Sequence, residues 1–493
     1  MSLATQAFVR TSYGVLLFAT LVITLPQGRR FFVSDRYGGY AKADPLTDRI
    51  QNPILLPFIM ALWLLSAAMI ALGHRTVLFC LINLLICRYL FIHMRWKGIL
   101  RGMGAPGFMT YWLAACVFFL EYSLFMDPTG GLRPLALLAF KIDFAVIMLS
   151  AGLYKVLAGY RENEGMDFGM VNPWWGYWRK RYRKLPPNHV FFKTLNHLAY
   201  GTEIVAAILL LIPSTQFLGA MLIIGSFLFI ATQIRLGFLC EMVVLAAFLY
   251  IDAGSLADRV ISSFMPVAWL PAGGPASAPP FVNTVVGAFL WAYIALLPLA
   301  HAGLYYNFLW RRSLPEVLQR ALESYTNFFG IIIWRVFSVD VVNFFVNIYI
   351  WDKTTGEREL YSRVGAFDWK TRCRYLHVGE FISLASIFTT LKYYPTNTEL
   401  FHERLMRYAK TISCPPGSAL LFEYMSITKS CRCFEFLPVV EYVVDVHGQT
   451  VEERIINDAI SVRAAHRVSP VHEGAYPGSY VPLGARKGSA LWQ

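Results

Sequence analysis

The sequence contains few charged residues for its length. Asp, Glu, Lys and Arg make up 15% of the 493 residues, whereas hydrophobic residues make up 56%. Soluble globular proteins carry about 25% charged residues, and a composition this apolar is typical of chains that cross a bilayer several times. The class of soluble globular proteins is therefore excluded for most of the chain, and the bilayer is the first solvent to consider.

Cysteine is scarce as well, and its positions form no recognisable framework. The cysteines outside the apolar runs lack the CxxC spacing of a structural zinc site. The sequence also lacks a P-loop, a dinucleotide-binding fingerprint, a HExxH motif and a nucleophile elbow. We therefore predict no metal site. Four cysteines lie inside apolar runs, where we expect the thiols to pack as small hydrophobic groups: Cys80, Cys87, Cys116 and Cys240.

Long apolar runs dominate the first two thirds of the chain. About nine of them, give or take one, have the 17 to 25 residues of a membrane-spanning helix. They must be helical, because hydrocarbon cannot satisfy the open backbone groups of other structures. The first run is followed by Pro26 to Arg30 rather than by a cleavage pattern of small residues, so we expect it to be a membrane anchor. The predicted spans are 9–26, 53–72, 77–93, 108–126, 134–158, 196–213, 216–233, 235–251 and 282–304.

Positive charge is concentrated in every second connection between these runs, and the formal net charge is +13. By the positive-inside rule the basic connections, and the C-terminal region with them, are expected on the cytoplasmic side of the plasma (inner) membrane. An odd number of spans then puts the N-terminus outside. We expect anionic lipid headgroups, rather than nucleic acid, to be the partners of this charge. The basic connections are 29–49, 95–101, 161–193, Arg235 and Arg311 with Arg312.

The pattern changes after the last apolar run. Residues 1–312 are predicted to form the transmembrane helical domain, and residues 313–467 a smaller, strand-rich α+β soluble domain. Residues 468–493 are rich in Gly, Pro, Ser and Ala without periodicity and are predicted to be a flexible or extended tail. In the soluble domain we expect a hairpin of 341–351 with 357–362, a second pair 419–427 with 434–446, a strand 450–456, and helices at 379–391 and 397–412.

Several predicted spans contain ionisable residues, which are costly in a membrane and are therefore candidates for function. One interpretation pairs Lys141, Asp143 and Glu121 with one another and lets Lys155 extend to the headgroups. The other holds that a lysine in an apolar pocket loses its proton more easily and is a candidate base. Lys141 and Lys155 lie about four helical turns apart on one face, so both are expected to point into the bundle. For Arg88, His93 and His301 we expect packing roles.

Two short elements resemble a known family. Ser150 to Lys155, with the sequence SAGLYK, resembles the Ala-Gly-x-x-Lys element of vitamin K-dependent γ-glutamyl carboxylases and their horizontally transferred transmembrane (HTTM) relatives. Trp334 to Asp340 is similar to the element that opens the C-terminal domain of HTTM proteins and that lipase maturation factors echo. The resemblance implies a helical membrane domain before a β-rich domain, with Lys155 as the base acting on a quinone-type lipid cofactor. Lys141 or Glu121 would tune that site.

The sequence departs from the carboxylases in two respects. After Lys155 it continues with Val156 to Met166 instead of an acidic-Trp-x-x-Gly pattern. In addition, the C-terminal domain of the eukaryotic carboxylases is lumenal, opposite to the side that the charge pattern predicts here.

An unusual segment joins aromatic residues to a basic cluster. Trp174, Trp175 and Trp178 precede Arg179 to Lys184. Such a segment suits the membrane interface, with rings at headgroup depth and cations on lipid phosphates. It also suits an entrance for an amphipathic ligand such as a quinone, which makes the three tryptophans candidate cofactor-binding residues, or a docking site for a partner. Aromatic residues among cations also bind single-stranded nucleic acid, but we do not expect this next to a membrane.

Two functions from different classes follow from these observations. The first is a membrane enzyme of the carboxylase-like type that uses Lys155 as its base. The second is a non-catalytic maturation or assembly factor, whose helices anchor a domain that binds a protein client or sister subunit. A transporter would require broken helices in two related halves, and the sequence shows no convincing internal repeat.

Overall fold

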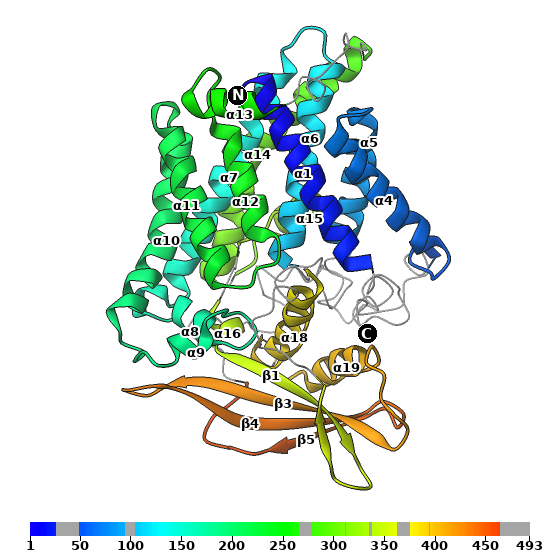
Figure 1. Ribbon diagram of the computed structural model, residues 1–493, viewed down its shortest axis with the longest axis vertical. Helices are drawn as coiled ribbons and strands as arrows, with labels where there is room; N and C mark the ends of the chain where they lie inside the picture. Colours follow the sequence, from blue (N-terminus) through cyan, green and yellow to red (C-terminus); the bar gives the residue numbers. More distant parts are fainter. Residues whose placement is uncertain are drawn as a thin grey trace.

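The computed structural model describes residues 1–25, 49–93, 104–265, 278–310, 312–334, 338–361, 375–393 and 395–463. It consists of a helical bundle, a sheet at one end of the bundle, and two helices between them (Figure 1). Some regions discussed above lie outside the described residues: the tail 468–493, residues 335–337 of the second family element, Arg311, and most of the basic connections 29–49 and 95–101. The same holds for Cys373, one of the cysteines outside the apolar runs.

Within the described residues, eight helices are long and apolar enough to cross a membrane. Each falls on one of the predicted spans, so the prediction of a bundle of long apolar helices is confirmed. Helices of this length and composition are typical of an integral membrane protein. The helices are α1 (Leu3–Thr24), α4 (Leu55–Leu72), α5 (Thr76–Cys87) with the π-helical turn η2 (Arg88–His93), α6 (Gly104–Phe125), α7 (Leu132–Leu157), α10 (Val190–Leu211), α11 (Gln216–Gln233) and α14 (Pro280–Trp310).

The remaining predicted span, 235–251, forms a shorter helix than expected. It contains α12 (Leu239–Ala247) and the 3-10 turn η7 (Phe248–Tyr250). The residues before α12 are not helical, because Ile234 makes a β-bridge with Gly176 and Gly237 adopts a positive φ of 60°. The backbone N–H of Arg235 donates to the carbonyl of Trp175 at 2.8 Å. A loop that pairs with this stretch therefore shortens the helix.

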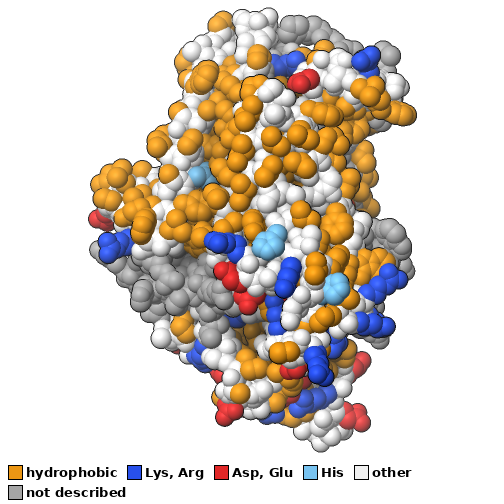
Figure 2. All heavy atoms as spheres, turned by 90° about the vertical axis from the view of Figure 1, so that its left-hand side faces the viewer, with side chains coloured by type: hydrophobic (Ala, Val, Ile, Leu, Met, Phe, Trp, Pro, Cys, Tyr) orange, Lys and Arg blue, Asp and Glu red, His pale blue; other side chains and the backbone are white. Residues whose placement is uncertain are grey.

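The outer surface of the bundle is apolar. Leucine, isoleucine and phenylalanine side chains are exposed along α10, α11 and α14, and Figure 2 shows them as a broad hydrophobic surface above the part that carries charges. Leaving each such side chain in water instead of hydrocarbon costs about 1.5–3 kcal/mol. The four cysteines of the apolar runs are buried, which confirms their packing role: Cys80, Cys87, Cys116 and Cys240.

Short helices close the two ends of the bundle. α13 (Leu256–Phe264) lies at the end away from the sheet and beside the N-terminus, where Asp258 accepts hydrogen bonds from Ser2 and Thr5. At the other end lie η5 (Tyr160–Glu162), α8 (Met166–Val171) and α9 (Arg179–Tyr182). α15 (Glu316–Phe329) packs on the bundle, since the Tyr325 hydroxyl donates to the carbonyl of Tyr293 at 3.2 Å. α16 (Val339–Val342) leads into the sheet.

The C-terminal sheet is antiparallel, with the strand order β2-β1-β3-β4-β5. Its strands are β1 (Phe344–Asp352), β2 (Arg358–Leu360), β3 (Ser418–Lys429), β4 (Phe434–Asp445) and β5 (Thr450–Ile455). The helices α18 (Tyr375–Tyr393) and α19 (Thr398–Ala409) cover the face toward the bundle, where Phe388, Phe401 and Tyr442 pack together. The predicted hairpins and both predicted helices are confirmed.

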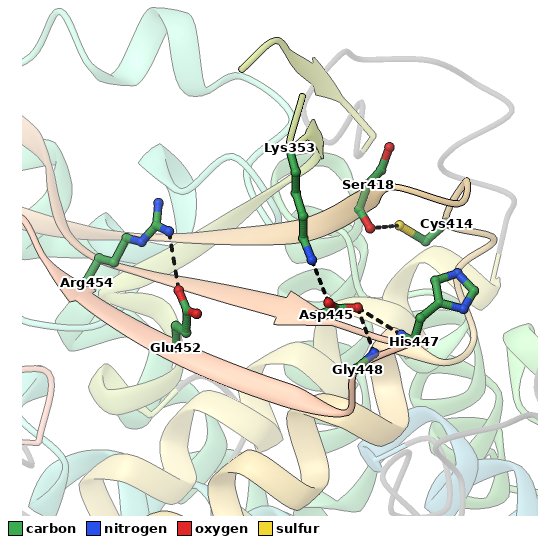
Figure 3. A network of polar contacts seen from close by, with 8 residues as sticks. All are labelled: Lys353, Cys414, Ser418, Asp445, His447, Gly448, Glu452 and Arg454. Atoms are coloured by element: carbon green, nitrogen blue, oxygen red, sulfur yellow. Dashed lines mark hydrogen bonds and ion pairs between the residues drawn. The ribbon is translucent and has the colours of Figure 1, made fainter. Parts of the chain in front are cut away.

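Hydrogen bonds join two turns at one end of this sheet (Figure 3). Lys353, in the β1–β2 turn, donates to Asp445 at 2.5 Å, and Asp445 accepts the backbone N–H groups of His447 and Gly448 in the next turn. These hydrogen bonds, the one from Gly448 first, lower the pKa of Asp445 to about 2. The two turns are thereby joined by a solvent-exposed ion pair.

Candidate functional site

A buried ion pair links two membrane helices near the end of the bundle that carries the sheet. Lys155 lies in the last turn of α7, and its Nζ contacts Oε1 of Glu203 on α10. The side chains are only 6% and 3% exposed. The expectation that Lys155 extends to the headgroups is therefore wrong, because its ammonium group has a carboxylate partner inside the protein.

The glycine of the Ala-Gly-x-x-Lys element explains how the pair can form. A Cβ at Gly152 would lie 2.6 Å from Cγ1 of Ile204 and 3.1 Å from the carbonyl oxygen of Tyr200, both on α10. Only glycine permits this approach of the two backbones. Because Gly152 lies three residues before Lys155, the close crossing brings the lysine within reach of Glu203.

One oxygen of Glu203 has no hydrogen bond. Its Oε1 accepts from Lys155, whereas its Oε2 is buried and accepts no hydrogen bond from the described residues. A buried carboxylate oxygen without a partner is costly, about 1–3 kcal/mol or more for a charged group. The site thus contains an amine and an unsatisfied acceptor side by side in an apolar interior.

Further buried polar groups lie on the sheet side of this pair. Tyr160 is fully buried, and burial raises the pKa of its hydroxyl well above 10, with Glu203 adding to the effect. Asn196, two helical turns before Glu203 on α10, accepts the backbone N–H of Met166 at 2.8 Å and contacts Asp167 at 3.5 Å. The buried Asp167 is joined by Lys429 from β3, with 2.6 Å between Nζ and Oδ2.

The other candidate residues lie apart from Lys155. Lys141, near the opposite end of α7, donates to Gln216 at 2.8 Å. Asp143 accepts from the Trp112 indole at 2.8 Å and from the Tyr293 hydroxyl at 2.6 Å. The expected mutual pairing of Lys141, Asp143 and Glu121 is therefore wrong, because each side chain has partners on other helices.

Glu121 belongs to a separate cluster with α1. It accepts from Gln6 at 3.1 Å and pairs with Arg10 at 3.5 Å. The structure thus does not bring Glu121 and Lys155 into one site. Of the residues expected to have packing roles, His301 lies against the carbonyl of Leu297 at 3.1 Å on its own helix.

The tryptophan segment is a junction between the bundle and the sheet. Trp174 and Trp175 are 0% and 3% exposed, and both pack on Phe381 of α18. These two rings therefore pack inside the protein and do not contact lipid headgroups. Of the three interpretations of this segment (membrane interface, ligand entrance and docking site), the docking site fits Trp174 and Trp175. The partner that docks there is the chain's own C-terminal domain. Trp178 is half-buried and donates to the carbonyl of Thr232 at 2.9 Å.

Asn172 makes hydrogen bonds across the same junction. Its side-chain amide donates to the carbonyls of Val342 at 2.8 Å and Phe344 at 2.7 Å, at the start of the sheet. Its side-chain oxygen accepts the backbone N–H of Trp174 at 2.8 Å. The composition of this segment predicted an aromatic and basic surface, but it gave no signal that the tryptophans face inward.

A second buried lysine was missed by sequence reasoning. Lys392 of α18 lies 3.8 Å from Asp340, the aspartate of the second family element, and donates to Asn343 at 2.9 Å. Burial lowers its pKa to about 8, although Asp340 opposes the shift. Lys392 ends an apolar helix outside the predicted spans, so its burial had no signal in hydropathy.

Among the described residues, no group of three or more His, Cys, Asp or Glu side chains is placed to hold a metal ion. Comparisons with protein-family models, with curated proteins and with solved structures found no match. The function therefore has to be argued from the geometry of the chain itself.

Proposed function

We propose that this chain is a membrane enzyme of the HTTM and vitamin K-dependent carboxylase-like type, in which Lys155 and Glu203 form the acid–base pair. The observation that carries the proposal is the burial of this pair between α7 and α10. Replacing a buried ion pair with apolar residues is often neutral or stabilising, so such a pair is weak evidence for a structural role. Ionisable residues inside a membrane bundle are functional candidates by default.

In the proposed reaction Lys155 passes its proton to Glu203, whose carboxylate contacts the lysine Nζ, and then accepts a proton from a substrate hydroxyl. Neighbouring Tyr160 keeps its hydroxyl proton because of its own burial, which leaves Lys155 and Glu203 as the groups that exchange protons.

The family resemblance implies a quinone-type lipid cofactor, and the residues present fit one. Lys155 offers a donor, and the unpaired Oε2 of Glu203 offers an acceptor, and both groups are buried between two apolar helices. Such a group would supply a weakly acidic hydroxyl and a two-electron redox centre. Lys155 would hold the hydroxyl and take its proton, and Glu203 would set the charge of Lys155.

Retention of quinone by the purified protein tests this proposal. The wild type, Lys155→Ala and Glu203→Gln are purified in mild detergent, and the extracted lipids are identified by mass spectrometry. We expect a stoichiometric quinone-type lipid with the wild type and its loss from both variants, at unchanged elution from a sizing column. The control is Lys141→Ala, which removes the other lysine of α7 and should retain the lipid. Absence of a quinone from the wild type, or its retention by Lys155→Ala, contradicts the proposal.

A second candidate function is a maturation or assembly factor. It is favoured by the junction at Asn172 and Trp174, which holds the sheet against the bundle and leaves the outer sheet face directed away from it. That outer face carries Trp351 beneath the Arg454 guanidinium at 4.9 Å and an ion pair of Arg358 with Glu441 at 2.6 Å. Aromatic and arginine side chains are common anchors in protein interfaces.

Purification from the native cell separates the two candidates. A protein client or sister subunit that remains bound in stoichiometric amount, equally with wild type and Lys155→Ala, supports an assembly factor. A monomeric chain with bound quinone supports the enzyme.

We further propose that the C-terminal domain lies on the cytoplasmic side of the plasma (inner) membrane. The support is that the basic segment of α9 and the sheet are at the same end of the bundle (Figure 1). Cys431 and Cys433 are exposed in the β3–β4 turn and provide the test. A membrane-impermeant thiol reagent should not label them in intact cells and should label them after lysis.

A further inference from the structure

A run of cations without carboxylate partners among the described residues surrounds α9. The guanidinium groups of Arg181 and Arg183 lie over the rings of Trp178 at 5.0 Å and Phe436 at 4.1 Å. Between Arg179 and Thr202 the chain has no acidic residue. Of its cationic side chains, all but the half-buried Arg179 are exposed, and none forms an ion pair within the described residues. We call this set the α9 basic segment: Arg179, Lys180, Arg181, Arg183, Lys184 and Lys193. Like charges held this close repel one another, so the segment favours an anionic ligand.

The segment is fixed to the ends of two membrane helices. Tyr182 stacks on Phe191 of α10 with ring centroids 5.6 Å apart and planes at 16°, and its hydroxyl donates to Gln233 at the end of α11. Trp178 donates to the carbonyl of Thr232 at 2.9 Å. These contacts hold the cations in place before any ligand arrives, which reduces the entropic cost of binding.

The apolar face of α10 begins directly beside these cations. Leu198, Val205, Ile208 and Leu211 are each about half exposed and follow one another up the helix. Figure 2 shows this hydrophobic surface with Lys, Arg and His side chains along its lower margin, together with a few Asp and Glu side chains. A ligand with an anionic head and apolar tails could therefore place its head on the cations and its tails along the apolar face of α10.

We propose that the α9 basic segment binds the phosphate headgroup of an anionic phospholipid, whose acyl chains lie along the exposed face of α10. Guanidinium groups bind phosphate oxygens in bidentate geometry, and ammonium groups add point charge. Trp178 and Tyr182 lie beside these cations and contact the ends of α11 and α10, and aromatic residues are enriched at bilayer boundaries. This inference does not depend on catalysis by Lys155, because none of these residues touches the Lys155–Glu203 pair.

The test compares two matched double variants in lipid nanodiscs of phosphatidylcholine with a minor fraction of phosphatidylglycerol. Lys180→Gln with Lys184→Gln removes two cations from the segment. Lys353→Gln with Lys410→Gln removes two exposed lysines from the C-terminal domain. Native mass spectrometry then measures which lipid stays bound after release from the disc. Because all four side chains are exposed, each variant should fold, and a sizing column checks this.

We expect the wild type to retain phosphatidylglycerol in preference to phosphatidylcholine. Each lysine lost from the segment should lower this preference about fivefold, hence about 25-fold for the pair. The control should match the wild type. The proposal is overturned if the wild type shows no preference, or if both double variants lose it equally. It is also overturned if inorganic phosphate at equal concentration displaces the lipid, since the segment would then recognise free phosphate.

Discussion

The ring of Trp174 stacks on that of Phe381 with planes 5° apart and centroids 5.7 Å apart, across the junction between a membrane-side loop and the C-terminal domain. Trp174 is completely buried there, and its second aromatic contact is Phe344, the first residue of β1. The helices and the sheet thus share one core rather than being joined by a free linker.

Replacing Trp174 by alanine should therefore separate the two regions. Loss of a buried aromatic side chain costs about 3–5 kcal/mol, so we expect a lower thermal midpoint in detergent and faster proteolysis between α16 and the bundle. Trp174→Phe should cost much less, because the indole N–H makes no hydrogen bond in the described structure. The half-exposed Trp178→Ala is the control, and an equal loss in that variant would argue against a shared core at Trp174.

Replacing Gly152 by alanine should destabilise the protein, although this substitution usually stabilises a helix. Alanine normally stabilises a helix by about 1 kcal/mol relative to glycine. At Gly152 the new methyl group would clash with Ile204 at 2.6 Å, and overpacking costs about 1–3 kcal/mol. We therefore expect Gly152→Ala to lower the thermal midpoint and to reduce quinone retention, by moving Lys155 away from Glu203.

The matched control for Gly152 is Gly225→Ala on α11, where an added Cβ meets nothing within 4 Å. It should leave the midpoint unchanged or raise it. Equal behaviour of the two alanine variants would show that α7 and α10 do not need this close crossing.

The outline of the fold could be predicted from the sequence because hydropathy and turn residues act locally. The long apolar runs predicted the membrane helices, and Gly356, with φ at +77°, follows the turn that joins β1 to β2. The run 235–251 does not form one full-length helix because the backbone of Ile234 and Arg235, at its start, bonds to the distant Gly176 and Trp175. Local composition carries no information about such a contact.

The candidate site could be predicted only in part. Lys155 was found because it is charged within an apolar run, but its partner Glu203 lies on a different helix and nothing in their spacing pairs them. For Trp174 the same composition suits a membrane interface and a buried junction, and only tertiary packing distinguishes them. Lys392 had no local signal, since it ends a helix of ordinary length.

Two lysines of the C-terminal domain form ion pairs, one with Asp167 of α8 and one with Asp445, and we expect their removal to have very different effects on stability. Lys429→Met leaves Asp167, which is fully buried, without its partner. Breaking a buried pair in this way costs about 3–5 kcal/mol. Lys353→Met breaks the exposed pair with Asp445 shown in Figure 3 and should cost at most about 1 kcal/mol.

A double-mutant cycle measures the coupling within the buried pair. Adding Asp167→Asn to Lys429→Met should recover most of the lost stability, because the uncompensated charge disappears. Additive losses in thermal midpoint for the two substitutions would show that Lys429 and Asp167 do not interact.

Because Lys392 is buried, we expect the free energy of unfolding to rise with pH. Burial lowers its pKa from 10.5 to about 8 in the folded protein, so the unfolded chain binds more protons than the folded chain between these values. Stability must then increase as the pH rises from about 8 to about 10.5, and the full effect corresponds to about 3 kcal/mol. Below about pH 8 the folded state bears the whole cost of the buried charge.

The variant Lys392→Met isolates this contribution. The methionine has no proton to release. The thermal midpoint of the wild type should therefore rise relative to that of the variant as the pH increases across this range. The variant also leaves Asp340 without its ammonium partner at 3.8 Å, which lowers its stability at every pH in this range but does not change the slope. A pH-independent difference between the two proteins would mean that Lys392 titrates in the folded state as it does in water.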